Sequence, residues 1–528
     1  MTTQNWWDHA LGYEIYIRSF ADGNADGVGD FVGMLDKLEY LAWLGIDVLW
    51  ITPFYESPLR DWGYDVADYV AIDRTYGTLD DFDAVITRAH ELGMRVIIDI
   101  VPNHTSDQHR WFQAALEDPA SEYRDYYIWQ DPPADGSLPN NWVGYFGGPV
   151  WTLEPTTGQY YLHLFLPEQP DLNWRNPAVQ AEFEKILRFW LDRGVDGFRI
   201  DVAQALVKDA QLRSNPQLAP CDETMFRWDQ WAAFDHQHDV LQPETLAIYQ
   251  AWNAIADEYD AFLLGETYDL VQLDKLDRLL SGGDALHVGF WFGAMHLEWN
   301  AKSIRSTFAT PLEAISAGLG WAQNSHDEHR SVTRFGGGEV GKRRALALAV
   351  LLAGLPGMPF LYQGEELGLE SGEVSAEDKL DPVGGDDPNA GRDGTRTPMP
   401  WAPGPGMGFT DAGVQPWLPF GGRTDGDTVA VQREDPGSAV HCYRRLIEVR
   451  RSIPHFSTEA LEWLEAGEEV VAYRRGDVAF VANISEHPTP FPLEGELLFS
   501  TTDMGEPPHL LEPDEARIIR LSNDGSAS

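Results

Sequence analysis

Ionisable residues stand at the ends of several apolar segments of this sequence. Asp201 ends the segment 197–201, Glu266 ends 262–266, and the pair His326 and Asp327 ends 321–327. A carboxylate that closes an apolar strand is costly to bury without a partner. Three carboxylates at one place would suit glycoside cleavage, in which one attacks the anomeric carbon, a second donates a proton and a third stabilises the developing positive charge.

Two other interpretations compete with this chemistry. The first is a set of structural ion pairs, which accounts for any one of the carboxylates as well as catalysis does, but less well for all three together. The second is a metal centre. The absence of a Glu-x-x-His or His-x-x-x-His pairing among these residues disfavours it.

The elements that must position these side chains alternate between strand-like and helix-like segments over the first four hundred residues. Helices with apolar residues at a period of 3.6 are predicted at 34–44, at 79–92 and around 183–191. An α/β fold, a (β/α)8 TIM barrel, follows from eight strands with intervening helices. A doubly wound open sheet is the alternative, but no glycine-rich phosphate turn follows the first strand. The eight strands are predicted at 13–18, 46–51, 95–101, 197–201, 262–266, 285–291, 321–327 and 358–363.

The rhythm of strands and helices is interrupted in places, which predicts additional domains. Residues 105–171 are too long for an ordinary loop and are predicted to form a small inserted subdomain B after the third strand. Residues 1–104 and 172–455 then form the two parts of the catalytic barrel, the second with a long eighth loop at about 370–425. Short alternating runs in 456–528 predict a C-terminal antiparallel β-sandwich and tail.

The composition excludes several classes of partner. The chain carries 84 Asp and Glu against 38 Lys and Arg, a formal net charge of −46. Such acidity disfavours nucleic acid and anionic lipid as partners, although a high-salt habitat explains it equally well. Two cysteines make no disulfide framework, and neither a signal peptide nor an apolar run of about 18 residues is present. We therefore expect a cytoplasmic protein without a membrane partner, whose oligomeric state the sequence does not predict.

Six stretches, in this order along the chain, carry a resemblance to a known family. They are 99–104 (DIVPNH), 169–173 (QPDLN), 197–203 (GFRIDVA), 265–267 (GET), 326–327 (HD) and 391–401 (GRDGTRTPMPW). In them the sequence resembles the α-amylase family, glycoside hydrolase family 13, and within it the α-glucosidase and oligo-1,6-glucosidase branch. The resemblance runs from about Trp6 to beyond Trp401. It departs from the family at Ser325, which separates Asn324 from the His-Asp pair, so no role is assigned to Asn324.

The resemblance implies a role for each matching residue. Asp201 would be the nucleophile, Glu266 the general acid and then base, and Asp327 would hold the 2- and 3-hydroxyls of the sugar. Arg199 would keep the Asp201 carboxylate ionised, and a closed pocket would admit only a terminal glucose. The substrate-binding residues implied are Asp61, Tyr64, His104, Phe146, Phe165, Arg199, His326 and Arg392, with Arg392 as the salt-bridge partner of Asp61.

The segment 22–30 places oxygen-bearing side chains at alternate positions, which suits a hard cation such as Ca²⁺ or Mg²⁺. Position twelve of this segment is Gly33 and not the glutamate of an EF-hand, and a plain turn rich in Asp and Asn is the alternative. The resemblance implies a structural ion here and no organic cofactor. Its ligands would be Asp22, Asn24, Asp26, Asp30 and the carbonyl of Val28.

Together these observations predict a retaining, exo-acting α-glucosidase for maltose-, isomaltose- or sucrose-like sugars. An α-glucosyl transferase or isomerase of the trehalose or isomaltulose synthase type would use the same carboxylates. A non-catalytic binding subunit is disfavoured, because all three carboxylates are present. Val202 resembles members that accept α-1,6 bonds, whereas 53–60 resembles trehalose synthases, so the linkage stays open.

Overall fold

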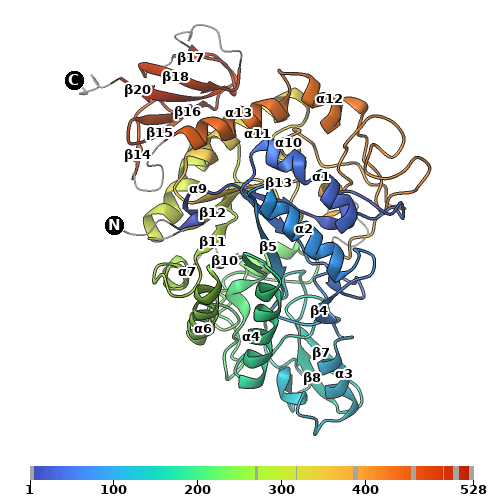
Figure 1. The fold of residues 1–528 in the computed structure, drawn as a ribbon. Coiled ribbons are helices and arrows are strands. Elements are labelled where there is room, and N and C mark those ends of the chain that lie inside the picture. Colours follow the sequence, from blue (N-terminus) through green and yellow to red (C-terminus); the bar gives the residue numbers. More distant parts are fainter. Residues whose placement is uncertain are drawn as a thin grey trace. The chain divides into compact units, whose positions relative to one another are not determined.

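Eight parallel strands close a barrel in the order β1-β13-β12-β11-β10-β9-β5-β2. Figure 1 labels β5, β10, β11, β12 and β13 of these strands. The structure is a computed structural model that describes residues 5–267, 272–316, 318–383, 391–453, 460–490, 493–502 and 510–522. The predicted TIM barrel is confirmed. Its strands are β1 (Gly12–Ile15), β2 (Val48–Ile51), β5 (Arg95–Ile100), β9 (Gly197–Ile200), β10 (Phe262–Gly265), β11 (Val288–Trp291), β12 (Leu319–Ala322) and β13 (Met358–Tyr362).

Two of the strands end several residues earlier than predicted. The strand predicted at 13–18 ends at Ile15, and the chain turns into a short 3-10 helix, η2 (Ile17–Ser19). The strand predicted at 321–327 is β12, which ends at Ala322. The side chains of Gln323 and Asn324 bond to Glu365 instead, so His326 and Asp327 lie in the loop beyond the strand.

The chain divides into two compact units. Unit 1 comprises residues 1–52, 84–96 and 290–528, and unit 2 comprises 53–83 and 97–289. The main helices of unit 1 are α1 (Phe31–Leu44), α9 (Ala301–Ala314), α10 (Ser331–Arg334), α11 (Gly338–Gly354), α12 (Val429–Glu434) and α13 (Ala439–Ser452). Those of unit 2 are α3 (Arg110–Glu117), α4 (Pro177–Asp192), α5 (Arg227–Ala232), α6 (Glu244–Tyr259) and α7 (Leu273–Leu280), and α2 (Leu79–Glu91) spans the boundary.

Unit 1 ends in antiparallel sheets, as predicted. One sheet has the order β14-β15-β16-β20-β18, and a second pairs β17 (Thr489–Pro490) with β19 (Leu510–Leu511). Tyr473 and Phe480 stack on each other with ring centroids 5.3 Å apart, and the Tyr473 hydroxyl donates to the carbonyl of Leu351 in α11. A side chain at Gly354 would clash with both rings, so a glycine at the end of α11 lets the sheet approach the helix. The strands of the first sheet are β14 (Leu461–Trp463), β15 (Val470–Arg475), β16 (Val478–Asn483), β18 (Gly495–Ser500) and β20 (Ala516–Leu521).

Unit 2 contains the segment inserted after β5. It includes a three-stranded antiparallel sheet of the order β6-β8-β7, formed by β6 (Trp129–Gln130), β8 (Gln159–Leu162) and β7 (Trp151–Glu154), and a hairpin of β3 (Tyr55–Glu56) with β4 (Asp68–Ile72) precedes it. The Arg124 guanidinium lies 3.2 Å from the centre of the Trp129 ring, and Phe112 packs against the rings of Trp129 and Tyr161 in this small core. The boundaries of the separate domains stay predictions.

Within the part of the chain that the structure describes, no helix combines the length and the apolar character that crossing a membrane requires. Cys221 and Cys442 are both free thiols.

A buried glutamate joins the first and last strands of the barrel to the first helix. Glu366, in the turn after β13, accepts hydrogen bonds from the hydroxyls of Tyr13 in β1, at 3.0 Å, and of Tyr40 in α1, at 2.8 Å. Its side chain is fully buried, and burial raises its pKa from 4.5 to about 7. Two tyrosine donors therefore only partly offset the loss of hydration.

Glu366→Gln should remove a dependence of stability on pH. Because the folded pKa is the higher one, the stability linked to Glu366 is fully present below about pH 4.5 and is lost as the pH rises through about 7. The loss approaches about 3 kcal/mol. In thermal denaturation the variant should therefore gain Tm relative to the wild type as the pH rises over this window. A difference in Tm that is constant with pH would contradict the buried, titrating glutamate.

Candidate active site

Three carboxylates of unit 2 share one buried guanidinium. Arg199 lies in β9, and its Nη1 is 2.7 Å from Asp99 Oδ1 and 2.7 Å from Asp201 Oδ1, while its Nη2 is 2.9 Å from Glu266 Oε2. The register of the parallel strands explains this arrangement, because Arg199 is level with Asp99 in β5 and with Leu264 in β10. Asp201 and Glu266 both follow the ends of their strands directly, as the sequence predicts.

The backbone between the two carboxylates is strained. Val202, directly after Asp201, has φ 46° and ψ 46°, a left-handed conformation that is costly for a β-branched residue. In this conformation its backbone N–H donates to Glu266 Oε2 at 2.8 Å, and the N–H of Ala203 donates to the Glu266 carbonyl at 2.9 Å. The turn after Asp201 thereby binds the carboxylate and the backbone of Glu266.

Burial dominates the electrostatics of Asp201. Burial raises the pKa of Asp201 well above its usual value, the charges of Glu266 and Asp99 raise it further, and Arg199 opposes them. Arg199 lowers the pKa of Asp201, as expected, but does not outweigh burial. Three carboxylates and one guanidinium would carry a net charge of −2 if all were ionised. Arg199 Nη2 and the backbone N–H of Val202 both bind Oε2 of Glu266.

Several predicted sugar-binding residues of unit 2 lie around the same cluster. The Tyr64 hydroxyl donates to Asp99 Oδ2 at 3.2 Å, and His104 Nε2 lies 3.2 Å from the Tyr64 carbonyl. Gln169 Nε2 reaches both Asp61 Oδ2, at 3.2 Å, and His104 Nε2, at 3.0 Å. Burial lowers the pKa of His104 to about 3, so this histidine is neutral near pH 7.

The two predicted aromatic residues also lie together. Phe165 is 5.0 Å from the His104 ring and 5.3 Å from Phe146, measured between centroids. Tyr145, to which the sequence assigned no role, stacks on Phe165 at 4.9 Å and on Trp231 of α5 at 4.3 Å. Phe165 therefore belongs to a row of packed rings that begins at His104.

A buried lysine fastens the segment that carries Gln169 to the end of β5. Lys208 Nζ lies 2.6 Å from Asn103 Oδ1 and 2.6 Å from Asp171 Oδ2, and Asn103 Nδ2 donates to Asp171 Oδ1 at 3.1 Å. Burial lowers the pKa of Lys208, and the charge of Asp171 opposes the shift. None of these three residues was given a role from the sequence. Asn103 and Asp171 fall in the recognised motifs, but Lys208 lies outside all of them.

Unit 1 holds the remaining predicted residues in a second cluster. Asp327 Oδ1 accepts from Arg396 Nη2 at 2.7 Å and from Arg392 Nη1 at 3.2 Å, and its side chain stays one-third exposed. Arg392 also pairs with Asp381 at 2.7 Å. Although burial opposes ionisation of Asp381, Arg392 holds its pKa at about 2. The sequence analysis gave no role to Arg396 or Asp381, because only the structure shows the contacts of Arg396 with Asp327 and of Asp381 with Arg392.

His326 is held on three sides in unit 1. Its Nδ1 contacts the Glu14 carboxylate at the end of β1, and its ring stacks on Tyr16 with centroids 5.5 Å apart. Arg396 Nε donates to its carbonyl at 2.8 Å. The other ring nitrogen, Nε2, lies 3.4 Å from Asp327 Oδ2.

The predicted cation loop is built around two aspartates. Asp22 accepts hydrogen bonds from the backbone N–H groups of residues 24–27 and from Thr410. Asp30 Oδ1 accepts from Gly23 N and Gly33 N, but its buried Oδ2 has no hydrogen-bond partner among the described residues. Over the described ranges, no three His, Cys, Asp or Glu side chains gather as in a metal centre.

Lys208→Met should destabilise the folded protein strongly. The variant keeps the length of the side chain but leaves the Asp171 carboxylate buried without its counter-ion, which costs about 3–5 kcal/mol. Denaturant unfolding measures the loss. Lys185→Met, which breaks the exposed pair with Glu182, is the matched control and should cost at most about 1 kcal/mol. Equal losses in the two variants would show that Lys208 is not a structural anchor.

Comparison with known proteins assigns the family. Residues 14–459 match the model of the α-amylase catalytic domain. A protein named "Probable alpha-glucosidase" from Rhizobium meliloti (strain 1021) is 40% identical over 89% of this chain and 87% of its own length. An oligo-1,6-glucosidase from Parageobacillus thermoglucosidasius is 35% identical over 98% and 99%. The solved structure of an alpha-glucosyl transfer enzyme, XgtA, superposes with a TM-score of 0.90 at 38% identity, covering 98% of this chain and all of that one. The chain therefore belongs to the α-amylase family of glycoside hydrolases, as the sequence motifs predicted.

Proposed function

We propose that this protein is a retaining, exo-acting α-glucosidase that removes terminal, non-reducing α-linked glucose from short sugars. The observation that carries the proposal is the pair of carboxylates, Asp201 and Glu266, bound to the two ends of the Arg199 guanidinium. Retaining glycosidases need two close carboxyl groups with different protonation states, one a nucleophile and the other an acid. The relatives named α-glucosidase and oligo-1,6-glucosidase support the same activity.

The reaction has two steps. Asp201 attacks the anomeric carbon while the bond to the leaving oxygen breaks, and Glu266 transfers its proton from Oε1 to that oxygen. Glu266 then takes a proton from water, and the resulting hydroxide attacks the anomeric carbon and releases Asp201. Two inversions return the α-configuration. Arg199 and the Val202 N–H hold Oε2 of Glu266 throughout, so its other oxygen handles the proton in both steps.

The remaining residues bind the terminal glucose. Asp327, in the loop after β12, would hold the 2- and 3-hydroxyls, and the two arginines on its Oδ1 fix its carboxylate plane. His104 and His326 would hydrogen-bond the same sugar. Asp61 and Tyr64, with Arg392 as partner, would close the pocket beyond the 4-hydroxyl, while Phe146 and Phe165 would form its aromatic rim.

Transfer or isomerisation is the second candidate, favoured by the likeness to a solved alpha-glucosyl transfer enzyme. Such an enzyme would use the same carboxylates but exclude water from the glucosyl-enzyme. The cytoplasmic location expected from the sequence stays a prediction.

Proton NMR of the protein with maltose, isomaltose, sucrose and trehalose, each supplied separately, tests the proposal. We expect α-glucose as the first product from at least one sugar, because the double displacement retains configuration. Asp201→Ala should keep its Tm but lose more than about 10³-fold in kcat. Initial release of β-glucose would contradict retention, and a new disaccharide with little free glucose would identify a transferase.

We also propose a structural Ca²⁺ or Mg²⁺ ion in the 22–30 loop. The buried Oδ2 of Asp30, which lacks a hydrogen-bond partner among the described residues, supports it, and burial raises the pKa of Asp30, a shift that a cation would reverse. Asp22, Asn24, Asp26, Asp30 and the carbonyl of Val28 would hold the ion, which would tie the loop to the start of α1. Its role would be stability and not catalysis.

Chelation should therefore lower the Tm of the wild type, and Ca²⁺ should restore it. At a hundredfold excess over Kd, a bound ion stabilises a protein by about 2.7 kcal/mol. Asp30→Asn keeps the cap of α1 through its Oδ1 but should lose the response to Ca²⁺ in differential scanning calorimetry. Asp118→Asn, in a turn elsewhere, is the control and should keep that response. If neither the chelator nor Ca²⁺ changes the Tm, the loop binds no structural ion and the proposal is wrong.

A further inference from the structure

Asn324 closes the loop that carries His326 and Asp327. It lies two residues beyond β12, and its Oδ1 accepts from the backbone N–H of Ser331, the first residue of α10. One side chain therefore joins the start of the 325–330 loop to its end. Inside the loop, Ser325 Oγ accepts from the Asp327 N–H at 3.2 Å.

Glu365 in turn fixes Asn324. Its Oε2 accepts from Asn324 Nδ2 at 2.6 Å, and its Oε1 accepts from Gln323 Nε2 at 2.8 Å and from the Tyr443 hydroxyl at 3.2 Å. Glu365 follows β13, so these bonds connect the ends of two neighbouring strands, β12 and β13. Glu365 is 5% exposed and Asn324 is 2% exposed. Every one of these contacts lies within unit 1.

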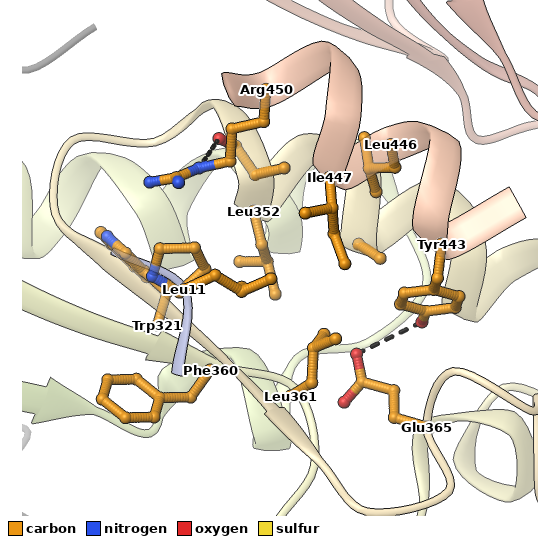
Figure 2. Close-up of a pocket in the computed structure, with 13 residues that line it drawn as sticks. Leu11, Trp321, Leu352, Phe360, Leu361, Glu365, Tyr443, Leu446, Ile447 and Arg450 are labelled. Carbon is orange, nitrogen blue, oxygen red and sulfur yellow. Dashed lines mark hydrogen bonds between the residues drawn. The ribbon is translucent and has the colours of Figure 1, made fainter. Parts of the chain in front are cut away.

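A small cavity beside Glu365 is lined mainly by apolar side chains. Figure 2 shows the Glu365 carboxylate turned toward the Tyr443 hydroxyl at the edge of a cavity of about 30 Å³. Aliphatic side chains line most of this cavity, among them Leu352, Leu361, Leu446 and Ile447. A water needs two to four polar partners in a buried site, which the aliphatic part of this lining does not offer.

We propose that Glu365 and Asn324 act together as positioning residues for Asp327. They do so through a hydrogen bond in which Asn324 must donate and Glu365 must accept. Both oxygens of Glu365 accept, and both ends of the Asn324 amide are committed, Nδ2 to Glu365 and Oδ1 to Ser331. Both residues act through the loop and not through contact with the sugar. The inference rests on the proposed function, because it gives Asp327 a part in the transition state.

The directed bond permits a swap of donor and acceptor. In Glu365→Gln the new amide faces the amide of Asn324, and in Asn324→Asp two carboxylates face each other. In the double variant, the new amide at position 365 would donate to the new carboxylate at position 324. That carboxylate would still accept from the Ser331 N–H, and the amide oxygen at position 365 would still accept from Gln323 and Tyr443. The number of carboxylates is the same in the double variant as in the wild type.

Steady-state kinetics on the sugar cleaved best by the wild type tests the proposal. Each single variant should lose about 100-fold in kcat with little change in KM, as expected when a transition-state group is displaced by about 1 Å. The double variant should recover to within about threefold of the wild type, since the coupling between the two positions is restored. Active sites are counted from the burst of the first product, so that unfolded protein does not lower kcat.

Glu366→Gln is the matched control, because it makes the same substitution at the next residue, which is equally buried but bonds to Tyr13 and Tyr40. It should keep the wild-type kcat. Single variants with wild-type kcat, or a double variant as slow as the single ones, would overturn the proposal. If a single variant does not fold, a folded double variant decides: wild-type kcat supports the positioning pair and reduced kcat overturns it. An inactive wild type would instead refute the proposed function.

Discussion

The carboxylate cluster of unit 2 depends on one interaction, the burial of the Arg199 guanidinium among acidic side chains. Arg199 is 1% exposed, and burial without partners would make its guanidinium prohibitively costly. Three carboxylates on neighbouring strands stabilise it, and their number exceeds what one cation can neutralise. The surplus negative charge is what a developing oxocarbenium ion can use. The arginine is therefore both the structural centre of the cluster and the reason that the two carboxyl groups proposed to react can lie close together.

In unit 1 the arrangement is reversed, because two guanidiniums bind one carboxylate. There two arginines, Arg392 and Arg396, hold Asp327, and Asp381 balances the extra charge. Asp327 is one-third exposed and so keeps a face for a ligand, whereas Asp381 is buried. A carboxylate bound by two guanidiniums is fixed in its plane, which suits the proposed binding of sugar hydroxyls. The number of arginines around each carboxylate thus distinguishes Asp327 from the three carboxylates that share Arg199.

The sequence was sufficient for the barrel and for the residues that match family motifs, because strand ends and motif spacing are local properties. It located Asp201, Glu266 and Arg199 on neighbouring strands and placed His326 and Asp327 at the end of another. It extended β12 to Asp327, because an apolar run does not show that Gln323 and Asn324 bond to Glu365, 41 residues beyond Asn324. Lys208 and Arg396 were overlooked for the same reason, and Asn324 was given no role because Ser325 separates it from the His-Asp pair. Each acts through a partner distant in sequence, and no periodicity reports such a contact.

The left-handed turn at Val202 has a consequence for attempts to evolve new specificities. A library at this position is usually thought to vary only the shape beside the scissile bond. Here each replacement also changes the energy of a backbone conformation that β-branched residues disfavour and that asparagine or glycine adopts readily. Selection for a new linkage would then act simultaneously on pocket shape and on how firmly the amide of residue 202 holds Glu266. Variants that differ little in side-chain volume could diverge in turnover for that reason alone.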